Sequence, residues 1–299
     1  MERKRVLKDR LASKFMLLLS VVASSIIFAM IIGLYLRSRT ILETKPLSEL
    51  LFSTSWHPLR GQFGFSPFIM GTLWVTGVAV VIAFPLSIMA AMFLSEYAHK
   101  LVRELSKPLI DLLAGIPSVV YGVWGILVIV PFVRDYVAPH FPESAGSSGY
   151  CILSGGIVLA VMICPIIIHV STEIFRSVPL EIREASLSLG ATKWQTTKLV
   201  VLRKGLPGVI AALVLGLSRA FGETMAVLLV VGNVAKIPSS VLQPAYPLTA
   251  LIANNYGEML SVPLYDSALL LASLILLLLV LFFNIVAQLV LIRIEKRIR

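Results

Sequence analysis

The fold of this chain is decided by the stretch PGVIAALVLGLSRAFGETMAVLLVVGNV at residues 207–234. Apart from Arg219 and Glu223 it carries no charge, and it exceeds the roughly 20 residues that a helix needs to cross a bilayer. Five more apolar runs of comparable length occupy residues 15–36, 67–94, 112–133, 151–170 and 267–292. The sequence therefore predicts an all-α integral membrane protein with six transmembrane helices.

The composition of the chain excludes a soluble domain. Of its 299 residues, 58% are hydrophobic and 14% are charged, and its mean hydropathy is +0.91. A soluble domain carries about 45–50% apolar and about 25% charged residues. The run at 15–36 is longer than the apolar region of a cleavable signal peptide, which has about 7–15 residues. We therefore expect the mature protein to keep it as its first transmembrane helix.

The basic residues predict the orientation in the membrane. Most Lys and Arg fall in segments that lie on one side of a six-helix topology, namely 1–14, 95–111, 171–206 and 293–299. Because cytoplasmic loops carry an excess of Lys and Arg, both termini are predicted to be cytoplasmic. This asymmetry accounts for the net charge of +10, so no nucleic-acid partner is expected.

The predicted cytoplasmic segment 171–206 has the signals of two short helices. Gly190 is typical of the residue that follows a helix, and Thr192 is typical of the residue that caps the start of the next one. We therefore expect a sharp turn at Gly190.

Sequence signatures of catalysis are absent. The chain contains no Walker A phosphate loop, no H-E-x-x-H helix and no Cys/His spacing typical of a metal site. These absences favour a non-catalytic transport subunit that binds no cofactor or metal. Any energy from ATP would then come from another chain.

Arg219 and Glu223 are the charges that fall well inside an apolar run. As members of one helix they would lie one turn apart on the same face, near the middle of the bilayer. A charge there costs roughly 2.5–3.5 kcal/mol, so each should be paired or face water. Two interpretations follow: a self-neutralising pair that holds the bundle together, or a cation in the path of an anion, with Glu223 moderating its affinity.

Several motifs resemble a known family of transport proteins. Glu184, Ala185 and Ser186, followed by Gly190, resemble the EAA loop of permease subunits of type I ABC importers. Four further stretches resemble the phosphate-specific PstC permeases: PFI at 67–69 with GTL at 71–73, FLSEYA at 93–98, LAGIPSVVYG at 113–122, and RAFGETMAV at 219–227. The PstA permeases share much of this pattern, and GETMAV favours PstC. One departure is Leu202-Arg203, where the EAA pattern usually ends in Leu-Pro.

The resemblance implies a transmembrane subunit of an ATP-driven inorganic phosphate importer in a bacterial inner membrane, with a permease core at 67–299. Its implied partners are a PstA-like sister permease, two PstB-like ATPase subunits that carry ATP and Mg, and a periplasmic phosphate-binding protein. Arg219 and Glu223 match residues of the substrate pathway. Glu184, Ala185, Ser186 and Gly190 match the loop that couples to the ATPase.

Two alternatives remain open at the level of the sequence. Within the same architecture, the substrate could be sulfate, molybdate or phosphonate, because a single arginine does not choose among oxyanions. In a different class, the chain could be a channel or secondary carrier that works without an ATPase.

Overall fold

The computed structural model describes residues 2–141, 148–258, 262 and 264–298 of the chain, with the side chains of all of these except 2–10, 295, 297 and 298. Within this part, six helices are long and apolar enough to cross a membrane: Leu11–Thr44, Ser66–Tyr97, Ser118–His140, Ile152–Ser177, Lys193–Gly222 and Tyr265–Ile294. The prediction of a six-helix membrane protein is confirmed. The predicted orientation rests in part on Lys and Arg in segments 1–14 and 293–299, and most of these side chains lie outside the described part of the structure.

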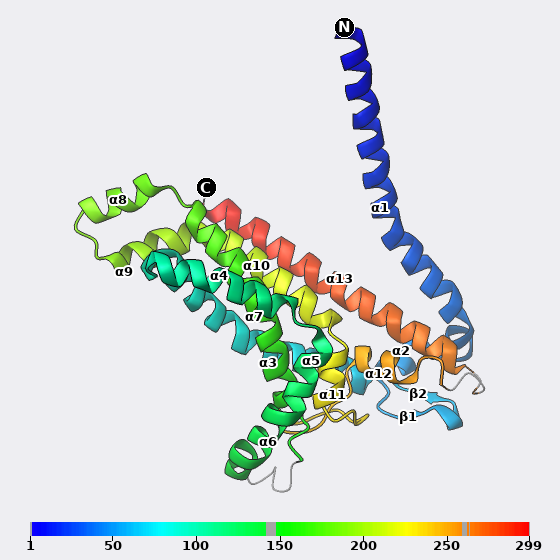
Figure 1. Cartoon of the computed structure of the whole chain (residues 1–299). Helices are drawn as coiled ribbons and strands as arrows, with labels where there is room; N and C mark the ends of the chain where they lie inside the picture. Colours follow the sequence, from blue (N-terminus) through cyan, green and yellow to red (C-terminus); the bar gives the residue numbers. More distant parts are fainter. Residues whose placement is uncertain (1, 142–147, 259–261, 263, 299) are drawn as a thin grey trace.

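The six spans are built from several helical elements (Figure 1). The first, second and third are α1 (Glu2–Thr44), α3 (Ser66–Met92) with the π-turn Phe93–Tyr97, and α5 (Ser118–Trp124) with α6 (Val130–Phe132) and the π-turns around it. The others are α7 (Ile152–Ser177), then α9 (Lys193–Thr196), the π-turn Thr197–Val201 and α10 (Leu202–Gly222), and finally α13 (Tyr265–Ile298). The shorter helices α2 (Leu47–Phe52), α4 (Lys100–Gly115), α8 (Leu180–Ser188), α11 (Met225–Val230) and α12 (Leu248–Asn255) connect them.

The centre of the bundle is the contact of α3 with α7, against which α10 also packs. Glycine makes room for a side chain of the facing helix, since a Cβ added at Gly156 would overlap the Val78 side chain. Small residues of α3, Ala79 and Ala83, are fully buried at this contact. Close approach through small residues is the usual basis of helix packing in a bilayer, where lipid tails compete for every apolar side chain.

The first half of α1 stands away from the bundle (Figure 1). Its apolar side chains, among them Phe15 and Leu19, are exposed. The second half contacts the rest of the chain near its end, where Ile41 is buried in a cluster with residues of α13 such as Leu269. The exposed half is therefore free to contact lipid or another subunit.

An aromatic cluster orders the predicted outer segment that follows α1. The strands β1 (Trp56–His57) and β2 (Gln62–Phe63) form a two-stranded antiparallel hairpin. The ring of Trp56 lies 5.6 Å from that of Phe63 and 4.9 Å from that of Phe68, which belongs to α3. This hairpin therefore fixes the entry into the second span.

The predicted start of the third span at residue 112 is wrong. Residues 112–115 complete α4, the helix ends at Gly115, and α5 begins at Ser118. Ile116 is extended, with φ −66° and ψ 130°. A residue that precedes proline is pushed out of the helical region, so Pro117 separates two helices that hydropathy alone joins.

Candidate functional site

The predicted fifth span, 207–234, is not one helix. The helix that contains Arg219 starts at Lys193, well before residue 207, and ends at Gly222. Glu223 is extended, with φ −72° and ψ 129°, and α11 begins at Met225. Tertiary contact supports the break, since the Thr249 hydroxyl of α12 donates a 3.0 Å hydrogen bond to the Glu223 carbonyl. Arg219 therefore lies in the last turn of α10, and Glu223 is not on the same helical face.

Arg219 and Glu223 do not neutralise each other. Among the described residues, no ion pair joins them or involves Arg219 at all, and the Arg219 side chain is exposed. The Glu223 carboxylate instead accepts a 3.2 Å hydrogen bond from the Ala226 amide at the start of α11. The interpretation of a self-neutralising pair is therefore wrong.

The surroundings of Arg219 place it at a discontinuity of the bundle. It lies within electrostatic range of Tyr121 in α5. The Tyr121 hydroxyl donates a 2.7 Å hydrogen bond to the Leu113 carbonyl, across the break between α4 and α5. The exposed Arg219 side chain thus lies in the neighbourhood of the break between α4 and α5.

The hollow beside Glu223 is too small for an oxyanion. It lies between α3, α10 and α12, measures about 10 Å³ and is lined by Thr72, Thr76 and Thr249 among others. Even one water needs about 10–15 Å³. Two of these threonines serve the backbone: Thr249 as described above, and Thr72 by accepting a 2.9 Å hydrogen bond from the Leu248 amide. This hollow therefore provides no passage for an anion in this conformation.

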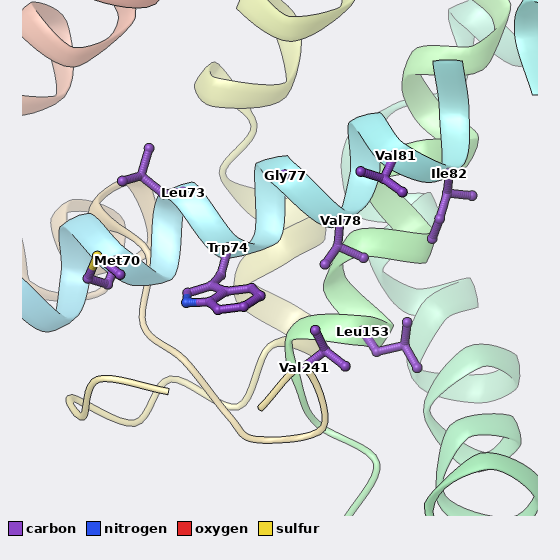
Figure 2. Close-up of a pocket in the computed structure, with 9 residues that line it drawn as sticks. All are labelled: Met70, Leu73, Trp74, Gly77, Val78, Val81, Ile82, Leu153 and Val241. Carbon is purple, nitrogen blue, oxygen red and sulfur yellow. The ribbon is translucent and has the colours of Figure 1, made fainter. Parts of the chain in front are cut away.

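A larger hollow of about 570 Å³ lies along α3 near the start of α7 (Figure 2). Apolar side chains line it, including Trp74, Val81, Leu153 and Val241. None of the described residues that line it is charged, so it is not a candidate for the anion pathway.

The turn at Gly190 is confirmed. Gly190 has φ +84°, and its amide donates to the Leu187 carbonyl at 2.9 Å, while the Ala191 amide donates to the Ser186 carbonyl at 3.3 Å. This pair of hydrogen bonds is the Schellman ending of a helix, for which a left-handed residue such as glycine is preferred. Thr192 then caps the next helix in a reciprocal capping box with Gln195.

The second helix after this turn is not short, contrary to expectation. From Lys193 it continues through the π-turn and α10 to Gly222, and it contains Arg203 and Pro207 without ending at either. At 1.5 Å per residue, its 30 residues form a rod of about 45 Å. One end of this rod is the Gly190 turn, and the other end carries Arg219.

The EAA-like residues divide between two faces of α8. Ser186 faces the neighbouring helix, where its hydroxyl lies 3.0 Å from that of Thr196 in α9. Glu184, Ala185 and Gly190 are exposed, as is Leu189, whose exposure reaches 89%. The hairpin of α8 and α9 projects from one end of the bundle, the end at which α13 also finishes (Figure 1). Its outer face is therefore available to a partner.

Two contacts that sequence reasoning missed hold this hairpin to the end of α3. Arg183 of α8 lies 3.2 Å from the Glu96 carboxylate, and these side chains are 17% and 8% exposed. Arg183 also donates to the Phe175 carbonyl. On the other arm, the Lys193 ammonium lies 4.7 Å from the centre of the Tyr97 ring. The sequence signal for Glu96 and Tyr97 was the FLSEYA motif at 93–98, which does not identify their partners on the hairpin.

Known proteins resemble this chain in sequence and in fold. The family model described as "Binding-protein-dependent transport system inner membrane component" matches residues 83–299. The chain is 35% identical to the phosphate transport system permease protein PstC of Xylella fastidiosa (strain 9a5c), over 98% of this chain and 94% of that protein. It is 33% identical to a probable PstC of Methanocaldococcus jannaschii, over 96% and 95%.

A solved structure shows the same fold at low sequence identity. One chain of a bacterial ABC transporter involved in the import of the acidic polysaccharide alginate aligns with a TM-score of 0.61 at 17% identity, covering 97% of this chain and 99% of that one. With the six transmembrane helices, these findings make the chain a multi-pass membrane protein, and it belongs to the family of binding-protein-dependent transport system inner membrane components.

Proposed function

We propose that this chain is the permease subunit of an ATP-driven importer of inorganic phosphate in a bacterial inner membrane. The observation that carries the proposal is Arg219, an exposed cation without an ion pair among the described residues, at the end of a membrane-spanning helix. The PstC names of its relatives supply the substrate class. A guanidinium group forms strong charge-assisted hydrogen bonds with phosphate oxygens. A single exposed contact keeps the affinity low, so that the ion can leave.

The pathway requires a sister permease of the PstA kind. The Arg219 side chain is exposed, and the hollow beside Glu223 cannot admit an oxyanion. A second permease facing Arg219 would complete the wall of the pathway. Glu223, held by the Ala226 amide, would limit how tightly an anion binds nearby.

The hairpin of α8 and α9 is the proposed contact with a PstB-like ATPase, one of two in the complex. On this hairpin Glu184, Ala185 and Gly190 are exposed. The Ser186 hydroxyl lies 3.0 Å from that of Thr196 and holds the two helices of the hairpin together. ATP and Mg would be bound by those partners, with no cofactor on this chain, and a periplasmic phosphate-binding protein would deliver the substrate. Movement of the hairpin would then reach Arg219 along the helical rod Lys193–Gly222 as a rigid-body motion.

The Gly190 turn offers a test of this coupling. In Gly190→Val, a β-branched residue would have to adopt φ +84°, which costs about 1–3 kcal/mol although the space around Gly190 is open. We expect the purified complex to hydrolyse ATP while transporting several-fold less phosphate per ATP. Gly190→Asn, which tolerates the left-handed region, is the matched control and should stay close to the parent. Unchanged coupling in Gly190→Val would show that the turn needs no defined geometry.

The proposed function itself is tested by uptake of labelled phosphate. Cells that lack their own phosphate systems would express this chain with its candidate sister permease, ATPase and binding protein, and each component would be omitted in turn. We expect uptake only when all four are present, and no suppression by excess sulfate. Uptake without the ATPase would indicate a channel or secondary carrier. An assembled complex that takes up sulfate or molybdate in place of phosphate would retain the architecture and reassign the substrate.

A further inference from the structure

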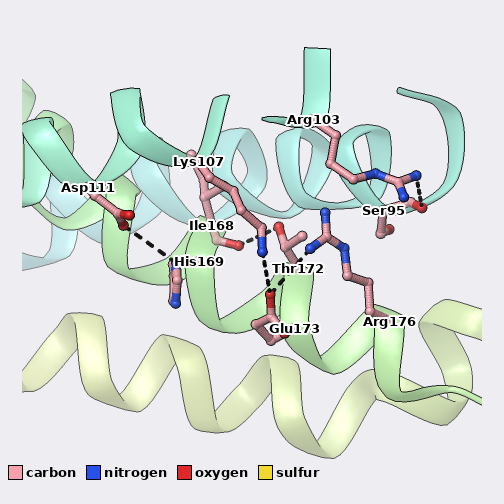
Figure 3. Close-up of polar contacts among 9 residues, drawn as sticks. All are labelled: Ser95, Arg103, Lys107, Asp111, Ile168, His169, Thr172, Glu173 and Arg176. Atoms are coloured by element: carbon pink, nitrogen blue, oxygen red, sulfur yellow. Dashed lines mark hydrogen bonds and ion pairs between the residues drawn. The ribbon is translucent and has the colours of Figure 1, made fainter. Parts of the chain in front are cut away.

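A cluster of basic side chains lines a hollow between α4 and α7, on the predicted cytoplasmic side (Figure 3), and Arg219 is not among the residues that line it. Arg103, Ser106 and Lys107 come from α4, and Thr172, Glu173 and Arg176 come from α7. We call these six residues the α4–α7 cluster. It combines three permanent cations with one carboxylate.

The single carboxylate is shared by two of the cations. One oxygen of Glu173 lies 3.4 Å from the Arg176 guanidinium and 3.7 Å from the Lys107 ammonium. The third cation, Arg103, has a 3.5 Å hydrogen bond to the Ser95 carbonyl, which carries only a partial charge. Two further carboxylates of α4 have other partners: Glu104 lies 3.9 Å from Lys100, and Asp111 lies 3.8 Å from His169, which also lines the hollow. The cluster therefore retains an excess of positive charge.

Donors of the cluster also lack acceptors. Within the described part of the chain, Arg103 Nε and both Nε and Nη2 of Arg176 are buried and have no hydrogen-bond partner. A buried donor without an acceptor costs about 1–3 kcal/mol, and more when it is charged. Ser106 and Thr172 each donate to a carbonyl of their own helix, and neither hydroxyl accepts from these arginine nitrogens. An incoming anion would offset the charge, and it would satisfy these donors once the two arginines turn them toward the mouth of the hollow.

We propose that the α4–α7 cluster binds a phosphate group, either the free inorganic ion or the headgroup of an anionic phospholipid. Two arginines suit this chemistry because the planar guanidinium group presents paired donors that match tetrahedral oxyanions. The enclosed space is only about 20 Å³, so the anion sits at the mouth of the hollow. Lys107 and Glu173 border this mouth, each with 53% of the side chain exposed, and Glu173 moves aside when the anion pairs with Lys107 and Arg176.

The α4–α7 cluster contacts the segment that holds the hairpin of α8 and α9. Arg103 contacts Ser95, and the next residue, Glu96, pairs with Arg183 of α8. An anion that attracts the Arg103 guanidinium weakens its contact with Ser95. Occupancy of the cluster therefore acts on the segment against which the hairpin rests.

The test uses the full chain in nanodiscs and reports on one site. Lys107 is half exposed, so its acetylation rate, measured by mass spectrometry, reports on an anion at the mouth of the hollow, and Lys198 of the π-turn serves as the reference amine. One arm titrates inorganic phosphate into discs of phosphatidylcholine, against chloride at equal ionic strength. The other arm compares discs with and without phosphatidylglycerol, with no inorganic phosphate present.

We expect phosphate or phosphatidylglycerol to slow acetylation of Lys107 and to leave Lys198 unchanged. Arg176→Gln should raise about tenfold the phosphate concentration that gives half-maximal protection of Lys107. This is the size expected for the loss of one charge-assisted hydrogen bond near solvent. Arg203→Gln, which changes an exposed arginine of α10, and Arg219→Ala should have no effect. Since Arg176→Gln could disturb α7, Glu173→Gln provides an independent variant, and removal of the competing carboxylate should strengthen the protection.

The two arms distinguish the source of the phosphate group. Protection by inorganic phosphate in neutral discs identifies the free ion, and protection only with phosphatidylglycerol identifies the lipid headgroup. Three results would overturn the proposal. Chloride would protect Lys107 as well as phosphate does, Lys198 would be protected as well as Lys107, or neither arm would show protection. Protection that Arg176→Gln and Glu173→Gln both leave unchanged would overturn it as well.

Discussion

Replacing Arg219 by alanine is expected to reduce phosphate uptake about a hundredfold while leaving the assembled complex intact. A hydrogen bond to a charged group contributes about 1.5–3 kcal/mol, and the upper value corresponds to roughly a hundredfold in rate. The fold should tolerate the change, because Arg219 is exposed and forms no ion pair within the described part of the chain. Uptake would be measured with labelled phosphate, and assembly by co-purification of the partner subunits.

The control for this variant comes from the same helix. Arg203→Ala removes an exposed arginine near the other end of α10 and should leave uptake close to normal. Arg219→Lys keeps the charge but loses the paired donors, so we expect an intermediate rate. Normal uptake by Arg219→Ala would remove this residue from the mechanism, and loss of assembly would show that it supports the contact between subunits.

Local signals in the sequence predicted the parts of the fold that depend on neighbouring residues. Long apolar runs were enough for six transmembrane helices, since a bilayer demands about 20 apolar residues whatever surrounds them. The turn at Gly190 and the cap at Thr192 were equally local, because the hydrogen bonds that form them span only a few residues. Those predictions required no knowledge of the tertiary structure.

The errors arose where distant segments decide the backbone. Hydropathy continues smoothly past Gly222, yet the helix ends there and Thr249, far along the chain, holds the Glu223 carbonyl. The separation of Arg219 from Glu223 follows from that break. The contact of Glu96 with Arg183 joins the end of α3 to α8, and no periodicity in the sequence reports such a pair.

This contact of Glu96 with Arg183 leads to the second large expected effect, the loss of coupling in Glu96→Gln. Removal of one partner from a buried ion pair costs about 3–5 kcal/mol, because the other charge stays buried without compensation. Arg183 Nη1 lies 3.2 Å from Glu96 Oε1, and this oxygen accepts no well-aligned hydrogen bond. The attraction is therefore mainly electrostatic, and it should be lost when Glu96 is replaced by the neutral glutamine. We expect α8 to loosen on α3, so that ATP hydrolysis continues with at least tenfold less phosphate transported per ATP.

The measurement is the ratio of phosphate transported to ATP hydrolysed in proteoliposomes, with amide hydrogen exchange of α8 beside it. Glu104→Gln is the matched control, because Glu104 belongs to an exposed pair with Lys100 at 3.9 Å, and such pairs contribute little. If α8 exchanges faster and less phosphate is transported per ATP, the buried pair of Glu96 and Arg183 transmits the movement of the ATPase to the membrane helices. Faster exchange with an unchanged ratio would mean that Glu96 only stabilises the hairpin, and that the ATPase acts on Arg219 through the helical rod Lys193–Gly222 alone.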